Sequence, residues 1–173
     1  MRFQTELLSK KHIRSNFKCA HESLNNYLKL QATKETKKRL ARVFVLANEE
    51  SAVIGYYTLS SAELPRESVP ENLQKQLPKN YSGYPAILIG RLAVTGSHTG
   101  KGLGGELMVD ALERCVIHSD SIGTRAIIVD PIDQNASKFY ERYMFKALPD
   151  SNRMLLHIDN NLRAHFGLPN LIE

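Results

Sequence analysis

The sequence is poor in cysteine and has no long apolar run. Its 173 residues include only two cysteines, Cys19 and Cys115, which are too few for a disulfide framework and fit no metal-ligand spacing. We therefore expect reduced thiols and no metal. The N-terminus "MRFQTELLSK" lacks the apolar core of a signal peptide, and runs such as "AILIG" are too short to span a bilayer. These absences predict a cytoplasmic protein with no membrane segment.

Internal repeats, low-complexity tracts and obvious linkers are also absent, and the length is that of one ordinary domain. We therefore expect a single domain over residues 1–173. The charge is unbalanced, because 23 Lys and Arg residues face 18 Asp and Glu residues, for a net charge of +5. Such a surface favours an anionic partner, which could be a nucleic acid, a phosphorylated cofactor or an acidic protein.

Hydrophobic periodicity predicts a mixed α/β sheet with helices on its faces. Helices are expected over 20–39, from 103 to about 116 and over 133–145, the last with Asp133 as its cap. Residues 65–85 carry four prolines and predict a loop or a short helix. The expected strands cover residues 3–8, 41–47, 52–64, 84–94, 125–130 and 152–158.

The stretch "HTGKGLGGELMVDAL" places four glycines at the start of a predicted helix. A helix N-terminus has unpaired N–H groups and partial positive charge, and glycines let those amides approach a phosphate closely. The stretch therefore predicts a phosphate-binding loop. The alternative is a tight turn into an ordinary helix.

Two familiar nucleotide motifs do not fit this loop. A Walker A loop needs four residues between its glycines, but Gly96 and Gly100 enclose three, and the lysine that follows precedes Gly102 instead of Ser or Thr. Gly100, Gly102 and Gly105 do satisfy G-x-G-x-x-G, and Asp120 follows at about the spacing of a dinucleotide fold. However, a polar loop separates them from the preceding strand, and too little chain follows for a second nucleotide-binding half.

The segment "LIGRLAVTGSHTGKGLGGELMVDAL" resembles the cofactor motif of the GNAT acetyltransferase superfamily, with Thr99 where the family pattern has Arg or Gln. "DQNASKFYERYMF" looks like the later GNAT helix. The resemblance implies a GNAT fold, with a mixed, mostly antiparallel twisted sheet and helices on both faces, and acetyl-CoA as co-substrate. The cofactor-binding residues it implies are Leu92, Ala93, Val94, Thr99, Gly100, Lys101, Gly102, Leu103, Gly104, Gly105, Asn135 and Phe139.

Three further segments, "FKCAHESLNNYL", "VIGYYTLSSAEL" and "ILIGRLAV", are similar to the acetyltransferase toxins of bacterial toxin–antitoxin pairs. Those enzymes acetylate the amino group of aminoacyl-tRNA and stop translation. With the two motifs above, the resemblance covers roughly residues 3 to 158. It implies an aminoacyl-tRNA substrate, a cognate antitoxin protein and commonly a homodimer.

A basic run follows the first predicted helix. Lys34, Lys38 and Arg42 recur every four residues, so they share one side if the helix persists, where they could follow an RNA backbone. A solvated helix face is the alternative. Arg91, in "GRLAV", belongs to the toxin-like segments, and we assign it to the same nucleic-acid contact.

The resemblance implies Tyr140 as the catalytic residue, because this tyrosine would meet the thioester sulfur. A phenol with a reference pKa of ~10 stays protonated at neutral pH and can give its proton to a thiolate. We expect Ala136, Phe139 and Tyr143 in the core and Tyr140 at the edge of their face. A strand bulge over 92–94 would offer a backbone amide to the thioester oxygen.

No general base stands out in the sequence. This favours an α-amino substrate, whose reference pKa of ~7.7–8.0 leaves a neutral fraction at pH 7. Two alternatives remain: a GNAT enzyme acting on a protein N-terminus or a small amine, and a non-catalytic module that binds nucleic acid or a protein. The last segment, 159–173, has Leu162 and Phe166 four residues apart and is a candidate docking helix.

Overall fold

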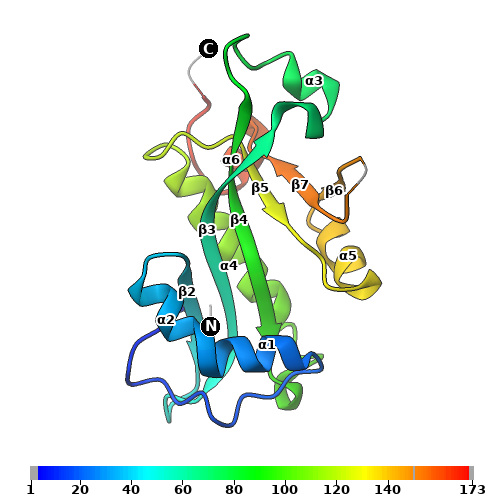
Figure 1. Cartoon of the computed structure of the whole chain (residues 1–173). Helices are drawn as coiled ribbons and strands as arrows, with labels where there is room; N and C mark the ends of the chain where they lie inside the picture. The colour runs from blue at the N-terminus through cyan, green and yellow to red at the C-terminus, as the bar shows by residue number, and fades with distance from the viewer. Residues whose placement is uncertain (1–3, 150, 172–173) are drawn as a thin grey trace. The chain divides into compact units, whose positions relative to one another are not determined.

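The computed structural model describes residues 4–149 and 151–171. The chain divides into two compact units, Met1–Ser60 with Ile89–Leu112 and Ser61–Leu88 with Glu113–Glu173. The described strands form one sheet in the order β1-β2-β3-β4-β5-β7-β6 (Figure 1). Its strands are β1 Glu6–Leu7, β2 Arg42–Ala47, β3 Val53–Pro65, β4 Gly83–Val94, β5 Ala126–Val129, β6 Lys146–Ala147 and β7 Met154–His157.

The predicted strands all form, and the short β6 is an addition. Pairs β1–β2, β2–β3, β5–β7 and β6–β7 are antiparallel, whereas β4 and β5 are neighbours joined through a helix. This confirms the mixed, mostly antiparallel sheet. The first expected strand is cut to two residues, and its residue 3 lies outside the described part. The described helices are α1 Glu22–Asn26, α2 Ala32–Lys37, α3 Glu71–Gln74, α4 Leu103–His118, α5 Gln134–Glu141 and α6 Asn160–His165.

Two consecutive tyrosines of β3 show that the first unit has helices on both faces of the sheet. Successive strand residues point to opposite faces. The hydroxyl of Tyr56 donates to the carbonyl oxygen of Leu24 in α1 at 2.8 Å, and that of Tyr57 donates to the carboxylate of Asp110 in α4. The first helical region and α4 therefore cover opposite faces, as predicted.

Helix α4 packs closely on the sheet because β3 has a glycine beneath it. The predicted apolar stripe of this helix is buried, with Leu107 1% exposed. A Cβ on Gly55 would lie 2.9 Å from Cδ1 of Leu107 and 3.4 Å from the carbonyl oxygen of Ala93. The absence of a side chain at this position thus sets the distance between helix and sheet.

The helix expected over 20–39 is present but interrupted. A π-helical segment, Tyr27–Gln31, separates α1 from α2. The helix then stops at Lys37, because Arg39 adopts φ +58 and the amide of Leu40 turns back to the carbonyl oxygen of Glu35 at 3.0 Å. A left-handed residue followed by such a bond is a common helix end.

The second unit has its own apolar core, in which Leu73 and Leu77 from the proline-rich segment pack with residues of β4, β5 and β7. The short-helix alternative for 65–85 is the correct one. Arg66 holds the segment by donating to the carbonyl oxygens of Gln74 and Pro78 at 2.9 and 2.8 Å. In the same unit, buried Arg163 of α6 binds both carboxylate oxygens of Asp120 at 2.6 and 3.0 Å.

None of the described helices is both long and apolar enough to cross a membrane. Within residues 4–149 and 151–171, no group of three or more His, Cys, Asp or Glu side chains could hold a metal ion.

Candidate functional site

The glycine loop of the first unit is open at its two left-handed positions. Gly100 and Gly102 both have φ +80, and a Cβ built at either would meet no atom within 4 Å. Positive φ explains why the chain uses glycine here. The open space beside both residues allows a ligand to reach the backbone directly.

The amides of this loop are available to a ligand. The carbonyl oxygen of Gly102 accepts from the amides of Gly105 and Glu106 at 2.9 and 3.2 Å, which closes the first turn of α4. In the described part of the chain, the amides from Gly100 to Gly104 donate no hydrogen bond within the protein. With the positive end of a 16-residue helix behind them, these amides form an anion-binding surface.

The side chains that flank these amides leave the anion-binding surface accessible. Lys101 is exposed and has no ion-pair partner among the residues that the structure describes. Thr99, which replaces the family's Arg or Gln, is exposed and donates to the carbonyl oxygen of Thr95 at 3.4 Å. Gly104 and Gly105 are half-buried in the first turn of α4, and Leu103 is buried.

The C-terminal end of β4 leads into the loop. Ala93 is 6% exposed and belongs to the core of the first unit, while Leu92 and Val94 are half-buried. Directly after the strand, the amide of Thr95 donates to the carbonyl oxygen of Ile54 at 2.9 Å. The bulge expected over 92–94 stays a prediction.

Arg91 is held by two residues of the first helical region. Its guanidinium carbon lies 3.6 Å from the ring centroid of Tyr27, and its Nη1 lies 3.9 Å from a carboxylate oxygen of Glu35. The same carboxylate accepts from the hydroxyl of Tyr27 at 2.8 Å. Burial and the Glu35 carboxylate raise the pKa of Tyr27, so this phenol stays protonated.

The Arg91 arrangement was only partly visible in the sequence. Tyr27 lies within the first expected helix, and the structure places it in the core, where it is 2% exposed. Its hydrogen bond to Glu35 joins residues eight apart across the π segment, a spacing that regular α-helical periodicity does not predict. Arg91 keeps 34% of its side chain exposed, so its contact with nucleic acid stays a prediction.

In the second unit, α5 turns a different face inward than expected. Asp133 caps this helix by accepting from the amide of Ala136 at 2.7 Å, as predicted. Tyr140 is the buried residue of α5, at 7% exposed, whereas Ala136, Phe139 and Tyr143 are half-buried. The expected core assignment was therefore reversed. The reason is local, because the Tyr140 ring packs edge-on against the buried ring of Phe145, 5.7 Å away, after the helix ends.

The hydroxyl of Tyr140 nevertheless reaches solvent. It makes no hydrogen bond with another described residue. Nε of Arg125 is the one described side-chain nitrogen or oxygen that is buried without a partner, so the Tyr140 oxygen is not buried. Burial of the ring, with a smaller contribution from the charge of Asp130, raises the pKa of Tyr140 to about 12. The residue is thus a buried ring whose O–H is not fully enclosed by the protein and stays protonated throughout the physiological range.

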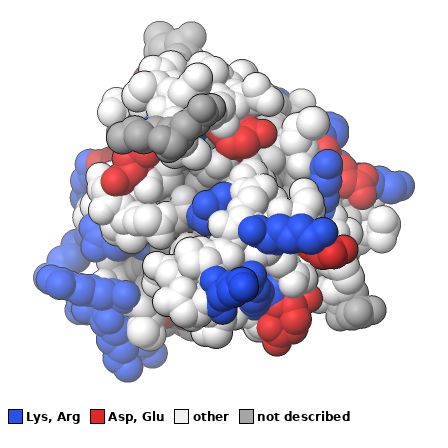
Figure 2. Space-filling model, turned by 90° about the horizontal axis from the view of Figure 1, so that it is seen from above, with Lys and Arg blue, Asp and Glu red and all other residues white. Residues whose placement is uncertain are grey.

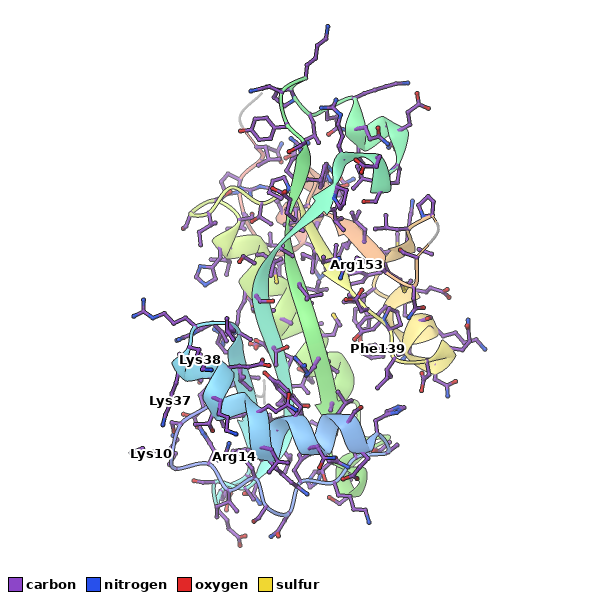
Figure 3. All side chains as sticks on the ribbon, in the orientation of Figure 1. Lys10, Arg14, Lys37, Lys38, Phe139 and Arg153 are labelled. Atoms are coloured by element: carbon purple, nitrogen blue, oxygen red, sulfur yellow. The ribbon has the colours of Figure 1, made fainter. Side chains whose placement is uncertain are left out.

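The two other site candidates of α5 differ in their exposure and in their contact with this tyrosine. Asn135 is exposed in the first turn. Phe139 is half-buried, with its ring 5.4 Å from that of Tyr140, and is labelled in Figure 3 together with Arg153. Arg153 binds both oxygens of Asp130 at 2.7 and 2.8 Å, so this carboxylate is already paired.

The predicted basic stripe does not form as one helical face. Lys34 lies in α2 and Lys38 at its C-cap, but Arg42 begins β2, because the chain leaves the helix at the left-handed Arg39. Lys34, Lys38 and Arg42 are all exposed. Their role in RNA binding stays a prediction, without the shared helix on which the spacing argument relied.

Comparison with known proteins gives consistent matches. The acetyltransferase (GNAT) family profile matches residues 8–145. The tRNA-acetylating toxin of Mycobacterium tuberculosis is 33% identical over 153 residues, 88% of this chain and 90% of that protein. The probable toxin TacT of Sinorhizobium fredii is 29% identical over 157 residues, 86% of each chain.

Solved structures share the fold. AtaT complexed with acetyl-methionyl-tRNAfMet superimposes with a TM-score of 0.86 at 25% identity, over 94% of this chain and 98% of that one. AtaTR bound with AcCoA gives a TM-score of 0.81 at 25% identity, over 94% and 97%. A tyrosine-to-phenylalanine mutant of KacT gives 0.87 at 24% identity, over 95% and 99%, and supports the fold alone.

Proposed function

Because the chain belongs to the acetyltransferase (GNAT) family, we propose that it transfers the acetyl group of acetyl-CoA to the α-amino group of aminoacyl-tRNA. By this reaction it acts as a toxin that blocks translation. The observation that carries the proposal is the similarity to a tRNA-acetylating toxin over 88% of the chain. The net charge of +5 suits an RNA substrate.

The loop of the first unit binds the diphosphate of acetyl-CoA. The unpaired amides from Gly100 to Gly104 supply donors at the positive end of α4, and Lys101 adds a mobile positive charge. The end of β4, from Leu92 to Val94, offers backbone groups to the pantetheine arm. Asn135 and Phe139 of α5 are the further cofactor contacts that the family implies.

The reaction forms one C–N bond and breaks one C–S bond. The neutral α-amine attacks the thioester carbonyl, and an amide of Leu92 or Val94 stabilises the oxygen as it becomes negative. As the intermediate collapses, Tyr140 gives its hydroxyl proton to the departing thiolate and the amine releases a proton to solvent. Tyr140 is then reprotonated from solvent.

The choice of an α-amine follows from the side chains present. Asp130 is occupied by Arg153, and no carboxylate or histidine in the described residues stands out as a base for the amine. An α-amino group needs little help, since its pKa of ~7.7–8.0 leaves part of it neutral at pH 7, unlike a lysine side chain at ~10.4.

The partners follow from the same proposal. Both curated relatives are named as toxins, so we propose a cognate antitoxin protein that restrains this enzyme. Action on tRNA places it in the cytoplasm. A homodimer and a single folding domain over residues 1–173 belong to the same proposal.

The decisive experiment incubates the protein with acetyl-CoA and total charged tRNA and identifies acetylated aminoacyl-adenosine by mass spectrometry. Tyr140→Phe serves as the control variant, and a rate equal to that of the wild type would remove the acid role from Tyr140. Acetylation of only small amines or peptide N-termini would support the broader GNAT alternative. Absence of heat on titrating CoA into the protein would instead support a non-catalytic module.

A further inference from the structure

Two adjoining pockets of the first unit share the side chain of Arg14. They have volumes of about 310 and 510 Å³, and we call them the Arg14 pockets. Figure 3 shows Lys10, Arg14 and Lys37 on the N-terminal loop and α2. The smaller pocket is lined by Leu8, Ser9, Lys10, Arg14, Thr33, Thr36 and Lys37, and the larger by His12, Ile13, Arg14, Ser15 and Lys29.

Among residues 4–149 and 151–171, no carboxylate pairs with the lysines or the arginine of these pockets, and the Glu6 carboxylate contacts only the imidazole of the lining residue His12, at 3.1 Å, and Lys11 outside the lining. Neither lining contains an Asp or Glu residue. Arg14 donates from Nη1 to the hydroxyl oxygen of Thr33 at 2.6 Å and to the carbonyl oxygen of Leu28 at 3.3 Å, both uncharged. Lys10, Lys29 and Lys37 form no ion pair with any described residue. Four cations therefore line this surface without a carboxylate partner in the part of the chain that the structure describes.

The helical side of the pockets is a continuous polar face. Lys29, Thr33, Thr36 and Lys37 follow one another at intervals of four, three and one residues, whereas Leu28, just before them, and Ala32, among them, are fully buried. Residues three or four apart on a helix lie on one side. The two ammonium groups and the hydroxyl of Thr33 supply donors that suit phosphate oxygens, whereas the hydroxyl of Thr36 donates to the carbonyl oxygen of Ala32 at 2.8 Å.

We infer that the Arg14 pockets hold the sugar-phosphate backbone of the RNA substrate, apart from the reacting amine; this rests on the proposed function. The cations are spread over two adjoining pockets instead of converging on one point, which fits successive phosphates of a strand. Such contacts fix the position of an RNA without reading its bases. Figure 2 shows that Lys and Arg side chains also gather at the lower left of the face drawn there.

The test compares two double variants of equal charge. Lys10→Gln/Lys37→Gln removes two unpaired cations of the smaller pocket, and Lys75→Gln/Lys79→Gln removes two lysines of the second unit. The wild type and both variants are assayed for acetyl transfer to aminoacyl-tRNA and to an aminoacyl-adenosine, which has no RNA backbone. Binding of uncharged tRNA is measured between 50 and 200 mM salt.

We expect the pocket variant to raise KM for aminoacyl-tRNA by on the order of tenfold with kcat unchanged, because positioning contacts are lost and chemistry is not. Its salt dependence of log K should become shallower by about 1.8, or roughly 0.9 for each phosphate contact. Its activity on aminoacyl-adenosine, and both activities of the Lys75→Gln/Lys79→Gln control, should match those of the wild type.

Equal KM values and salt slopes for the two variants would overturn the inference while leaving the acetylation proposal intact. Loss of binding to a poly-glutamate peptide, without loss of tRNA binding, would also overturn it and would point to an acidic protein segment. If the wild type acetylates no aminoacyl-tRNA, the proposed function fails. Selective loss of uncharged-tRNA binding in the pocket variant would still support RNA binding by the pockets.

Discussion

At the scale of single residues, Tyr140 illustrates how one side chain can be both core and candidate catalyst. Its ring is 7% exposed and contributes to packing, while its hydroxyl is neither buried nor hydrogen-bonded to a described residue. Packing of the ring fixes the position of the hydroxyl oxygen, and burial raises the pKa of Tyr140 to about 12. The raised pKa makes the phenol a weaker acid. It can still protonate the leaving group, because the departing thiolate develops a full negative charge.

The raised pKa of Tyr140 determines the expected pH profile. The rate should rise with pH through the α-amine pKa of ~7.7–8.0 as the nucleophile loses its proton. It should not fall again below a pH of about 11, because Tyr140, with a pKa of about 12, is still protonated there. Initial rates of acetyl transfer over this range, taken before the ester hydrolyses, measure the profile.

Tyr140→Phe removes the proton donor and keeps the ring. We expect kcat to fall by roughly 10²- to 10⁴-fold, the usual contribution of a general acid, with the amine limb of the profile and the affinity for acetyl-CoA unchanged. A fall in the wild-type rate between about pH 8 and 10 that disappears in this variant would mean that the phenol titrates far below its expected value.

At the scale of elements, the loop before α4 depends on backbone conformation more than on side chains. Gly100 and Gly102 take a φ that other residues adopt at a cost. The helix behind them supplies both the amides and the dipole. The element as a whole, and no single side chain in it, is the proposed phosphate site.

Gly102→Ala tests this element. The substitution should raise the Kd for acetyl-CoA by roughly tenfold, because a Cβ would occupy the space beside the free amides and the left-handed backbone costs ~1 kcal/mol. Calorimetric titration measures the affinity. Gly167→Ala is the matched control, since Gly167 also has a positive φ of +71 and an open Cβ position but follows α6. Equal affinities in the two variants would contradict the loop assignment.

The contact of β3 with α4 gives a second test at this scale. In Gly55→Ala the new Cβ would lie 2.9 Å from Cδ1 of Leu107, so this side chain, which is 1% exposed, would have to shift within the core. We expect a loss of about 1–3 kcal/mol in the free energy of unfolding, typical of overpacking, in a urea titration. Gly123→Ala, with nothing within 4 Å of its Cβ position, should change stability by less than about 0.5 kcal/mol.

At the scale of the whole molecule, the two compact units are not independent pieces of chain. β3, β4 and α4 each contribute residues to both units, and both units draw on segments that are distant in the sequence. An element that begins in one unit and ends in the other loses part of its hydrogen bonds when either unit unfolds. The prediction of a single domain over 1–173 can therefore be tested by whether the two units unfold together.

Unfolding should occur in one cooperative transition. The calorimetric enthalpy should equal the van't Hoff enthalpy, and far-UV circular dichroism and tyrosine fluorescence should give the same midpoint. The Gly55→Ala variant should shift both signals together, although the substitution lies in only one unit. Two resolved transitions, with only one of them shifted by Gly55→Ala, would show that the units unfold separately.

The sequence by itself predicted the succession of strands and helices, the buried stripe of α4, the cap of α5 and the glycine loop. These features are local, since they depend on residue spacing, on capping chemistry and on backbone freedom. The family motifs are also runs of neighbouring residues, so the order of amino acids is enough to assign the chain to the acetyltransferases.

Only the tertiary structure decided which partners distant residues have. Arg42 does not share a helical face with Lys34, because the helix ends before Arg39. Tyr140 is buried, because Phe145 packs against its ring. The guanidinium of Arg91 stacks on the ring of Tyr27. The Arg14 pockets combine a loop with a helix some twenty residues later. No periodicity encodes such pairings, because they arise when the chain folds back and side chains compete for the same buried space.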